Sequence, residues 1–573
     1  MSEVNIGLII RDVEDERLYW ATYADEFLSE FMVPHENILL SNLRNSEELT
    51  RFSIVIAPFI YPDEWSEERV KALICYLKTG GRLLLCGEIP DPLQKVVGVV
   101  EGARITSSGI LKITLTDKGK EYLRDGRWEE GFLLVGGKPY VDGAAFDITA
   151  YKNVGGIELG VLEDPDSHDL LGTGIALNEY GSGLVLWFNG RPFWTIGSWS
   201  SDVYYFSDNS PWDWEKFKEM YSQAHKPIYT TKLALFSAIK CLLHSRRLPL
   251  ITGAFWKAEG GHIPLGVLFG EHDFEPGGDI HKEQYLRDVL ELDRSVGLPA
   301  AYMPTYDVIT REAVEEIEAY GQELGIQTWK VSRGFRQIRE EVERIHSICG
   351  RPLTSFDQHG DRPGGNTYFG MDYLLWMWRL GYKAHIESYH NYFDVYPFRP
   401  IYHDRSTGRL RLMETMYQLG GHTTVEDKSK PVREYVEEFR KFIERLRGIR
   451  IFLNHGVYYR KKAEWYREIL AKIIRLDSWK VHPKKLFRWL TARRKIVLKY
   501  CKEEENKYTA YLTNNGEETI EGFVIEVYLP PGIQMERSAV NTRKCGDCLL
   551  VEVPKLKLSS TVKVKLCLSE AIS

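Results

Sequence analysis

The sequence of 573 residues lacks long apolar runs, has few cysteines and carries no excess of basic residues. No run reaches the roughly 18–20 apolar residues that a membrane-spanning helix needs. The N-terminus, "MSEVNIGLII", lacks the basic segment and apolar core of a secretory signal, so we expect a cytoplasmic location and no membrane partner. The 74 basic and 81 acidic residues give a net charge of −7, which argues against a nucleic-acid partner.

Cysteine is scarce, with eight thiols scattered along the chain. Only Cys545 and Cys548, in "CGDC", have the spacing of a paired site. A zinc site would need a second pair of ligands, and none lies nearby in the sequence. The pair is therefore expected to be a local disulfide or two ordinary strand thiols.

The hydrophobic content of 43% and charged content of 27% are typical of a globular protein, and the length implies three or four domains. Residues 1–245 alternate helices with apolar strands such as "NIGLII", "FSIVIAPFI" and "RLLLCGEI". Apolar strands alternating with helices predict a parallel sheet covered on both faces. This segment is therefore expected to be a doubly wound α/β domain.

Two further segments follow. Residues 262–480 repeat strand and helix patterns regularly, which predicts a distorted βα barrel whose chemistry lies at the carboxyl ends of its strands. Residues 495–573 contain short alternating strands separated by Asn-Gly and Pro-Pro-Gly turns. We expect an antiparallel β-sandwich there, acting either as an accessory saccharide-binding module or as a structural cap on the barrel.

The first segment resembles the glutamine-amidotransferase-like domain that accompanies many carbohydrate-active enzymes. The resemblance is carried by "IVIAP", "VKALICYLKTGGRLLLCGEIP" and "YGSGLVLWFNG". An active amidotransferase needs a nucleophilic cysteine on a glycine-flanked elbow and a His–Glu pair downstream. Cys86 has glycine on one side only, Pro90 follows it, and the sequence offers no convincing His-x-Glu pair. We therefore expect a non-catalytic domain with a structural Cys86.

Polar residues gather just after the expected barrel strands. Histidines that follow several strands on the side where a barrel keeps its site favour a functional cluster. Imidazoles and carboxylates can hold a divalent metal, whereas the same carboxylates without metal could cleave a glycosidic bond. Spacing alone does not choose between these chemistries. The cluster lies in "EHDFE", "DQHGDR", "HIESYH" and "LNHG", whereas His346 falls in a helix and His422 in a glycine-rich loop.

Residues 266–458 resemble the polysaccharide deacetylases, the NodB-type carbohydrate esterases with a distorted βα barrel. "LGVLFGEHDFEP" stands where that family has a strand followed by an aspartate pair. "YLRDVLELDRSVGLPAAYMP", "AYGQELGIQT" and "EEVERIHSICGRPLTSFDQHG" resemble the next elements in order, and "IFLNHG" matches the strand with the late histidine. The resemblance implies a metal-dependent hydrolase that deacetylates a saccharide.

The sequence departs from this family at its metal-binding motif, His-Ser/Thr-x-x-His. Gln327 stands at the first histidine and Val331 at the second, while Thr328 is kept. Glutamine is a poor zinc ligand and valine is none, so the Asp-His-His site of the family cannot form from these positions. Asp357 or Gln358 also stands near the expected arginine, although Arg362 follows closely.

The resemblance and these departures together predict a hydrolase that removes an N-acetyl or other acyl group from a saccharide. It would use either a divalent metal, zinc or a similar ion, or a rebuilt acid/base site. Asp273 is expected to act as base or metal ligand and His455 as the acid that protonates the leaving amine. The predicted metal ligands are His272, Asp273, Glu275 and His359. The predicted catalytic residues are Asp273, His455, Glu271 and Asp357, and the predicted saccharide contacts are Arg362, Trp329, Tyr389 and His385.

Two other functions stay open at this point. A glycoside hydrolase on the same barrel would use acids among Glu271, Asp273, Glu275 and Asp357. A non-catalytic saccharide-binding or scaffold protein would have lost the metal of the family. The sequence also leaves open whether the chain forms a homo-oligomer.

Overall fold

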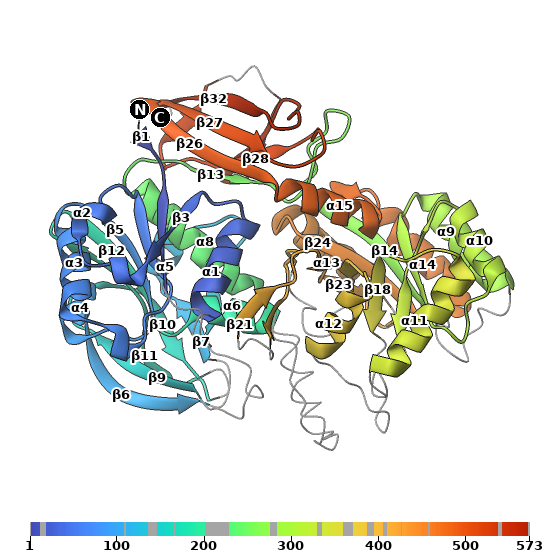
Figure 1. Ribbon diagram of the computed structural model, residues 1–573, viewed down its shortest axis with the longest axis horizontal. Coiled ribbons are helices and arrows are strands. Elements are labelled where there is room, and N and C mark those ends of the chain that lie inside the picture. Colours follow the sequence, from blue (N-terminus) through green and yellow to red (C-terminus); the bar gives the residue numbers. More distant parts are fainter. Residues whose placement is uncertain are drawn as a thin grey trace.

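The computed structural model describes residues 2–11, 19–107, 111–135, 146–164, 167–200, 228–274, 283–328, 335–358, 371–386, 395–404, 409–425, 427–455, 459–536 and 541–570. Figure 1 shows an N-terminal α/β body in blue and cyan, a β-sandwich in red at the top, and a second α/β body in green to orange. Both chain ends lie at the sandwich. Among the described residues, no helix is long and apolar enough to cross a bilayer.

A nine-stranded sheet forms the N-terminal body. Its first five strands are mutually parallel and the other four continue it in antiparallel pairs. In sheet order they are β3 (His35–Leu39), β2 (Ile6–Ile10), β4 (Ile54–Ala57), β5 (Arg82–Cys86), β12 (Gly183–Phe188), β11 (Leu170–Tyr180), β10 (Ile157–Glu163), β7 (Leu111–Leu115) and β8 (Phe132–Val135). An antiparallel pair, β6 (Val99–Ser107) and β9 (Phe146–Asn153), lies beside it.

Helices cover both faces of this sheet because its strands are apolar on both sides. Ile6 and Leu8 of β2 share a core with Phe27 of α1 (Tyr19–Glu30), whereas Ile9 packs on the other face with Leu73 of α3 (Glu67–Lys78). The doubly wound pattern expected from the sequence is thus present over the parallel strands. Cys86 is fully buried at the end of β5, and burial raises the pKa of its thiol.

The β-sandwich consists of two antiparallel sheets. One has the order β1 (Ser2–Glu3), β26 (Ile496–Glu504), β27 (Lys507–Asn514), β32 (Thr561–Glu570), β29 (Ile533–Met535). The other has the order β13 (Leu250–Gly253), β28 (Val524–Tyr528), β31 (Cys548–Glu552), β30 (Thr542–Cys545). β1 and β13 come from outside residues 495–573, so the chain start and the link between the two α/β bodies both become sandwich strands.

The second α/β body contains two parallel sheets. The first joins β16 (Glu323–Leu324), β15 (Ala300–Pro304), β14 (Gly266–Phe274), β24 (Ile449–His455) and β23 (His422–Thr424), and β25 (Ser478–Lys480) also pairs with β14. The second joins β17 (Ile326–Thr328), β18 (Ser355–Gln358), β19 (Ala384–His385) and β22 (Tyr417–Gln418).

The sequence predicts a single distorted barrel here, but the hydrogen-bond ladders of the described strands do not close into one. The chain instead passes from one sheet to the other at Gly325, between β16 and β17, and returns between β22 and β23. The strands that flank these two crossings have only two or three residues each, so the ladders are short there. The carboxyl ends of both sheets nevertheless converge, as the side chains described below show.

Helices lie against the outer faces of these sheets, as repeated βα units require. Leu268 of β14 packs with Leu286 and Val289 of α9 in an apolar core that Val267 and Phe269 do not share. The covering helices are α9 (Glu283–Val296), α10 (Arg311–Ala319), α11 (Phe335–Cys349), α12 (Met371–Arg379), α13 (Val432–Arg440) and α14 (Tyr459–Ile473).

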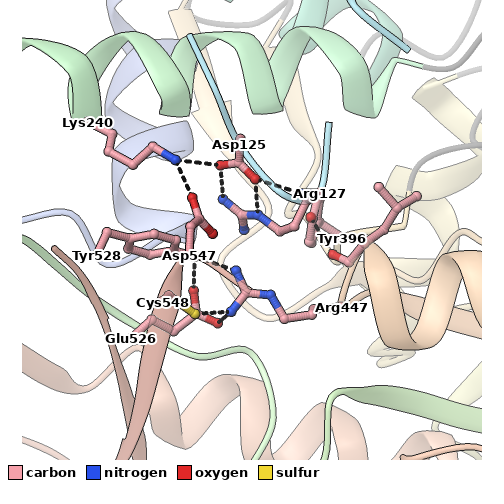
Figure 2. Close-up of polar contacts among 10 residues, drawn as sticks. Asp125, Arg127, Lys240, Tyr396, Arg447, Glu526, Tyr528, Asp547 and Cys548 are labelled. Carbon is pink, nitrogen blue, oxygen red and sulfur yellow. Dashed lines mark hydrogen bonds and ion pairs between the residues drawn. The ribbon is translucent and has the colours of Figure 1, made fainter. Parts of the chain in front are cut away.

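A buried polar network joins the three bodies next to α8 (Tyr229–His244) (Figure 2). Asp125 of the N-terminal body accepts hydrogen bonds from Arg127 and lies 3.5 Å from Nζ of Lys240 on α8. The same Nζ lies 2.5 Å from the carboxylate of Asp547 in the sandwich. Arg447, two residues before β24, reaches into this network from the second α/β body. We call these residues, with Glu526, Tyr528 and Cys548, the junction network.

Candidate active site

Three carboxylates from the two parallel sheets meet at the carboxyl ends of the strands. Glu271 and Asp273 come from β14 and Asp357 comes from β18. One oxygen of each lies within 4.8 Å of the others, and the three residues are at most 2% exposed. The two sheets therefore face each other across a shared carboxylate cluster.

Strand geometry explains which residues of "GEHDF" enter this cluster. The sequence predicts that the strand ends at Phe269 and that the acids follow in a loop, but β14 runs on to Phe274. Successive side chains of a strand point to opposite faces. Glu271 and Asp273 therefore share the inner face with Val267 and Phe269, whereas His272 points to the helix-covered face.

Glu271 shares a hydrogen bond with His422 of β23, with 2.7 Å between Oε2 and Nε2. Burial, and then the charge of Asp357, raise the pKa of the Glu271 carboxyl well above its usual value. Burial, and then the nearby Arg450 and His385, lower the pKa of His422 well below its usual value. Both directions put the shared proton on Glu271, which donates to a neutral His422.

Asp357 is held by the residue that replaces the first histidine of the deacetylase motif. Nε2 of Gln327 donates to Oδ2 of Asp357 at 3.3 Å, across the neighbouring strands β17 and β18. Gln327 is 2% exposed, and its Oε1 has no hydrogen-bond partner among the described residues. A buried amide group therefore lies against one of the three carboxylates.

His455 lies at the open side of the cluster. It is the register partner of Asp273 on the adjacent strand β24, with 3.8 Å between Nε2 and Oδ2. Its side chain is 27% exposed, compared with 1% for Asp273. Of the catalytic residues predicted from the sequence, the structure therefore brings Glu271, Asp273, Asp357 and His455 together.

His272 is separated from the carboxylates. Its Nε2 lies 2.8 Å from Oδ2 of Asp293 on α9, which also accepts a hydrogen bond from Tyr302 at 2.8 Å. These three residues are buried on the outer face of β14. A ligand role beside Asp273, as expected from the sequence, does not fit this direction.

The other predicted site residues divide into two groups. His385 is 5% exposed, stacks on Phe356 at 4.7 Å and accepts a hydrogen bond from Gln418, on the face of β18 opposite Asp357. Burial lowers its pKa to about 3, so it is neutral. The predicted ligands Glu275 and His359 and the predicted saccharide contacts Arg362, Trp329 and Tyr389 lie outside the described residues.

Sequence reasoning missed His422 and Gln327 as members of the site. His422 was expected in a glycine-rich loop, yet it opens β23 and is fully buried. The β-branched pair Thr423–Thr424 that follows it was the available strand signal. The family motif presents Gln327 only as a lost histidine. It does not suggest that the amide oxygen of Gln327 could itself be a metal ligand.

The donor atoms of the cluster decide which metal would fit. Zinc sites favour imidazole and thiolate, and the Asp-His-His set of the deacetylases is replaced here by three carboxylates and an amide. Carboxylate and amide oxygens are the ligands of hard cations such as Mg²⁺, Mn²⁺ and Ca²⁺. The residues present fit a hard divalent cation better than the zinc that the sequence led us to expect.

No protein-family model matches the sequence, and no curated protein matches it. Among solved structures, a Mycobacterium smegmatis protein assigned as a polysaccharide deacetylase aligns with 42% of this chain and 94% of its own, with 11% identity and a TM-score of 0.30. A family 4 carbohydrate esterase from Streptomyces lividans covers 40% of this chain and 96% of its own, with 14% identity and a TM-score of 0.24. An exo-β-1,4-mannosidase from Opitutaceae bacterium strain TAV5 covers 41% of this chain and 36% of its own, with 13% identity and a TM-score of 0.26.

These structural neighbours include carbohydrate esterases and a glycosidase. TM-scores this low do not establish a shared fold, so the similarity carries no argument about this chain. The functional conclusion rests on the site itself.

Proposed function

We propose that this chain is a saccharide hydrolase that removes an acyl group, with its active site at the carboxylate cluster. The observation that carries the proposal is the convergence of Glu271, Asp273 and Asp357, buried and within 4.8 Å of one another, at the carboxyl ends of parallel strands. The saccharide substrate follows from the deacetylase-like order of motifs in residues 266–458.

The roles follow from proton positions and exposure. Asp273 is the general base through Oδ2, the oxygen beside the partly exposed His455, and its other oxygen would serve the cation described below. His455 is the general acid, since its partly exposed side chain can reach the leaving group of a bound substrate. Glu271 keeps a proton, which it donates in a hydrogen bond to His422. Once that proton is lost, Glu271 is a metal ligand.

A hard divalent cation is part of this proposal. Glu271, Asp273, Asp357 and the Oε1 atom of Gln327 would hold it. The cation would supply Lewis acidity toward the acyl carbonyl. Gln327 also orients Asp357 through its Nε2 atom, so a single side chain both fixes and completes the donor set.

The first test measures acetate release from acetylated oligosaccharides. Asp273→Asn is expected to lower kcat by about 10²–10⁴-fold, the range that a general base contributes. Asp117→Asn is a matched control, because Asp117 is exposed on the N-terminal body. Acetate release by Asp273→Asn at the rate of the control would refute the assignment.

The second test removes the metal. Chelation is expected to abolish acetate release, and Mg²⁺ or Mn²⁺ is expected to restore it better than Zn²⁺. Gln327→Met keeps the side-chain length but loses the amide oxygen, so it should weaken cation binding by about 10–100-fold in calorimetric titration. His272→Gln is the control that should keep cation affinity, because His272 faces α9. Equal affinity in wild type and Gln327→Met would contradict the ligand set.

Glycoside hydrolysis is the second candidate, favoured by the short separation of the carboxylates. Retaining glycosidases place their two carboxyl groups about 5–5.5 Å apart, whereas inverting enzymes need about 6.5–9.5 Å. The cluster, in which one oxygen of each carboxylate lies within 4.8 Å of the others, fits the first arrangement better. New reducing ends without acetate release would identify this activity, and binding of oligosaccharide without either product would identify a non-catalytic module.

A further inference from the structure

Cys545 and Cys548 face each other across the hairpin that joins β30 to β31. They are direct register partners, and only Gly546 and Asp547 lie between them. Gly546 has a φ of +57°, the left-handed conformation that such a tight hairpin turn requires. Directly opposed residues of antiparallel strands have Cα atoms about 4.5–5.5 Å apart, within the range of about 4.4–6.8 Å that a disulfide spans.

The hairpin is part of the junction network (Figure 2). Nη1 of Arg447 lies 2.8 Å from Sγ of Cys548 and 3.1 Å from a carboxylate oxygen of Glu526, while Nη2 donates to Tyr528 at 2.6 Å. Asp547, inside the turn, pairs with Lys240. A buried guanidinium therefore points at one sulfur of the pair.

The two thiols differ in exposure and in proton affinity. Cys548 is 2% exposed, whereas Cys545 is partly exposed. The hydrogen bond that Cys548 donates lowers the pKa of Cys545 to about 6; burial opposes this shift, and Arg447 supports it. The accessible sulfur of the pair is thus the one that ionises first, which is the arrangement of a reactive thiol beside a resolving thiol.

We propose that Cys545 and Cys548 form a reversible thiol–disulfide site that exchanges with small disulfides such as oxidised glutathione, with Cys545 as the attacking thiol and Cys548 as the resolving thiol. Nothing in the proposed hydrolase mechanism uses either sulfur, so the site is independent of the carboxylate cluster.

The exchange balances in two steps. The Cys545 thiolate attacks one sulfur of oxidised glutathione, which forms a mixed disulfide and releases one glutathione thiolate. Cys548 then loses its proton to solvent and attacks the Cys545 sulfur, which forms the Cys545–Cys548 bond and releases the second glutathione thiolate. Two protein thiols are oxidised and one glutathione disulfide is reduced to two thiols.

Peptide mass spectrometry of the full chain tests the proposal. The reduced protein is equilibrated with mixtures of oxidised and reduced glutathione, alkylated and cut with trypsin, which releases both cysteines in one peptide, 545–555. The wild-type peptide is expected to lose two hydrogens and carry no alkyl group under oxidising mixtures. Dithiothreitol should then restore two alkyl groups.

Variants assign the two roles. Cys548→Ser should retain one glutathione on Cys545, because the resolving thiol is gone, and Cys545→Ser should leave Cys548 unmodified. Cys567→Ser, which alters an exposed thiol outside the pair, should behave as wild type in peptide 545–555.

Two outcomes would overturn the proposal. One is a wild-type peptide that stays doubly alkylated in mixtures that already modify Cys567. The other is a wild-type peptide that keeps glutathione and never forms the internal disulfide. Both are read from the wild-type protein, so they hold even if a serine variant fails to fold.

Discussion

Asp125 is a fully buried carboxylate between two buried cations, Arg127 and Lys240. Removing its charge takes the carboxylate away from Arg127 and leaves Lys240 with Asp547 alone, so Asp125→Asn is expected to destabilise the fold by about 3–5 kcal/mol. Scanning calorimetry should show this as a lower melting temperature of the transition that contains the junction network. The exposed Asp117→Asn control should leave the melting temperature nearly unchanged. Equal melting temperatures for the two variants would contradict the prediction.

Asp125 should also make the stability of the folded protein depend on pH. Burial alone would raise the pKa of Asp125, but the charges of Arg127 and Lys240 and the hydrogen bonds from Arg127 hold it below its usual range. A depressed folded-state pKa stabilises the protein above the unfolded pKa of about 3.9 and ceases to do so as the pH falls through the folded value. The melting-temperature gap between wild type and Asp125→Asn should therefore be constant near neutral pH and narrow in acid. A gap that widens in acid would show the opposite sign of linkage.

At the scale of elements, Gly325 sits where the chain leaves one parallel sheet for the other. A Cβ atom there would lie 2.3 Å from Sδ of Met303 and 3.0 Å from the carbonyl oxygen of Ser355. Gly325→Ala should therefore cost about 1–3 kcal/mol, as overpacking in a core does. It should also reduce hydrolysis, because β17 carries Gln327. Gly155→Ala is the matched control, since a Cβ atom there meets nothing within 4 Å; equal effects of the two variants would exclude a packing cause.

At the scale of the whole molecule, the sandwich connects both α/β bodies. β1 pairs with β26, β13 pairs with β28, and Phe236 of α8 contacts Tyr528 at 5.0 Å. A chain ending at Arg494 would leave β1 and β13 without partners and expose the apolar side of α8. We expect this shortened chain to bind hydrophobic dyes and to be cleaved rapidly by proteases, unlike a chain that ends at Glu570. A shortened chain with unchanged melting of the two α/β bodies would show that the sandwich is dispensable for them.

The mixed α/β character of the chain could be predicted because it depends on local periodicity, whereas the single barrel expected for residues 262–480 was wrong. Apolar strands such as Ile54–Ala57 indicate a sheet buried on both faces, and alternating strands such as Lys507–Asn514 indicate a sandwich. The strand pairings were harder to predict, because partners lie far apart in the chain. β13 was not expected in the sandwich, since its four residues carry no pattern that predicts pairing with β28.

The candidate site was predicted only in part, because its residue types are local but their contacts join distant strands. The density of acids in "GEHDF" indicated where the active site lies, but polar residues after an apolar run suggested a loop. The structure keeps Glu271, His272 and Asp273 in β14, where a one-residue step reverses the face that a side chain occupies. His422 was missed because its contact with Glu271 joins residues 151 positions apart.

The sequence by itself determined which residue types stand at the ends of the strands, and with them the kinds of chemistry available: carboxylates, one amide and imidazoles. Only the tertiary structure decided which of them meet. Strand alternation sent His272 to Asp293 and left Glu271 and Asp273 facing Asp357. The physical reason is that side-chain identity is local, whereas side-chain direction and burial depend on pairing between distant strands. The proton on Glu271 follows from that burial, because a desolvated carboxyl near another carboxylate is disfavoured in its charged form.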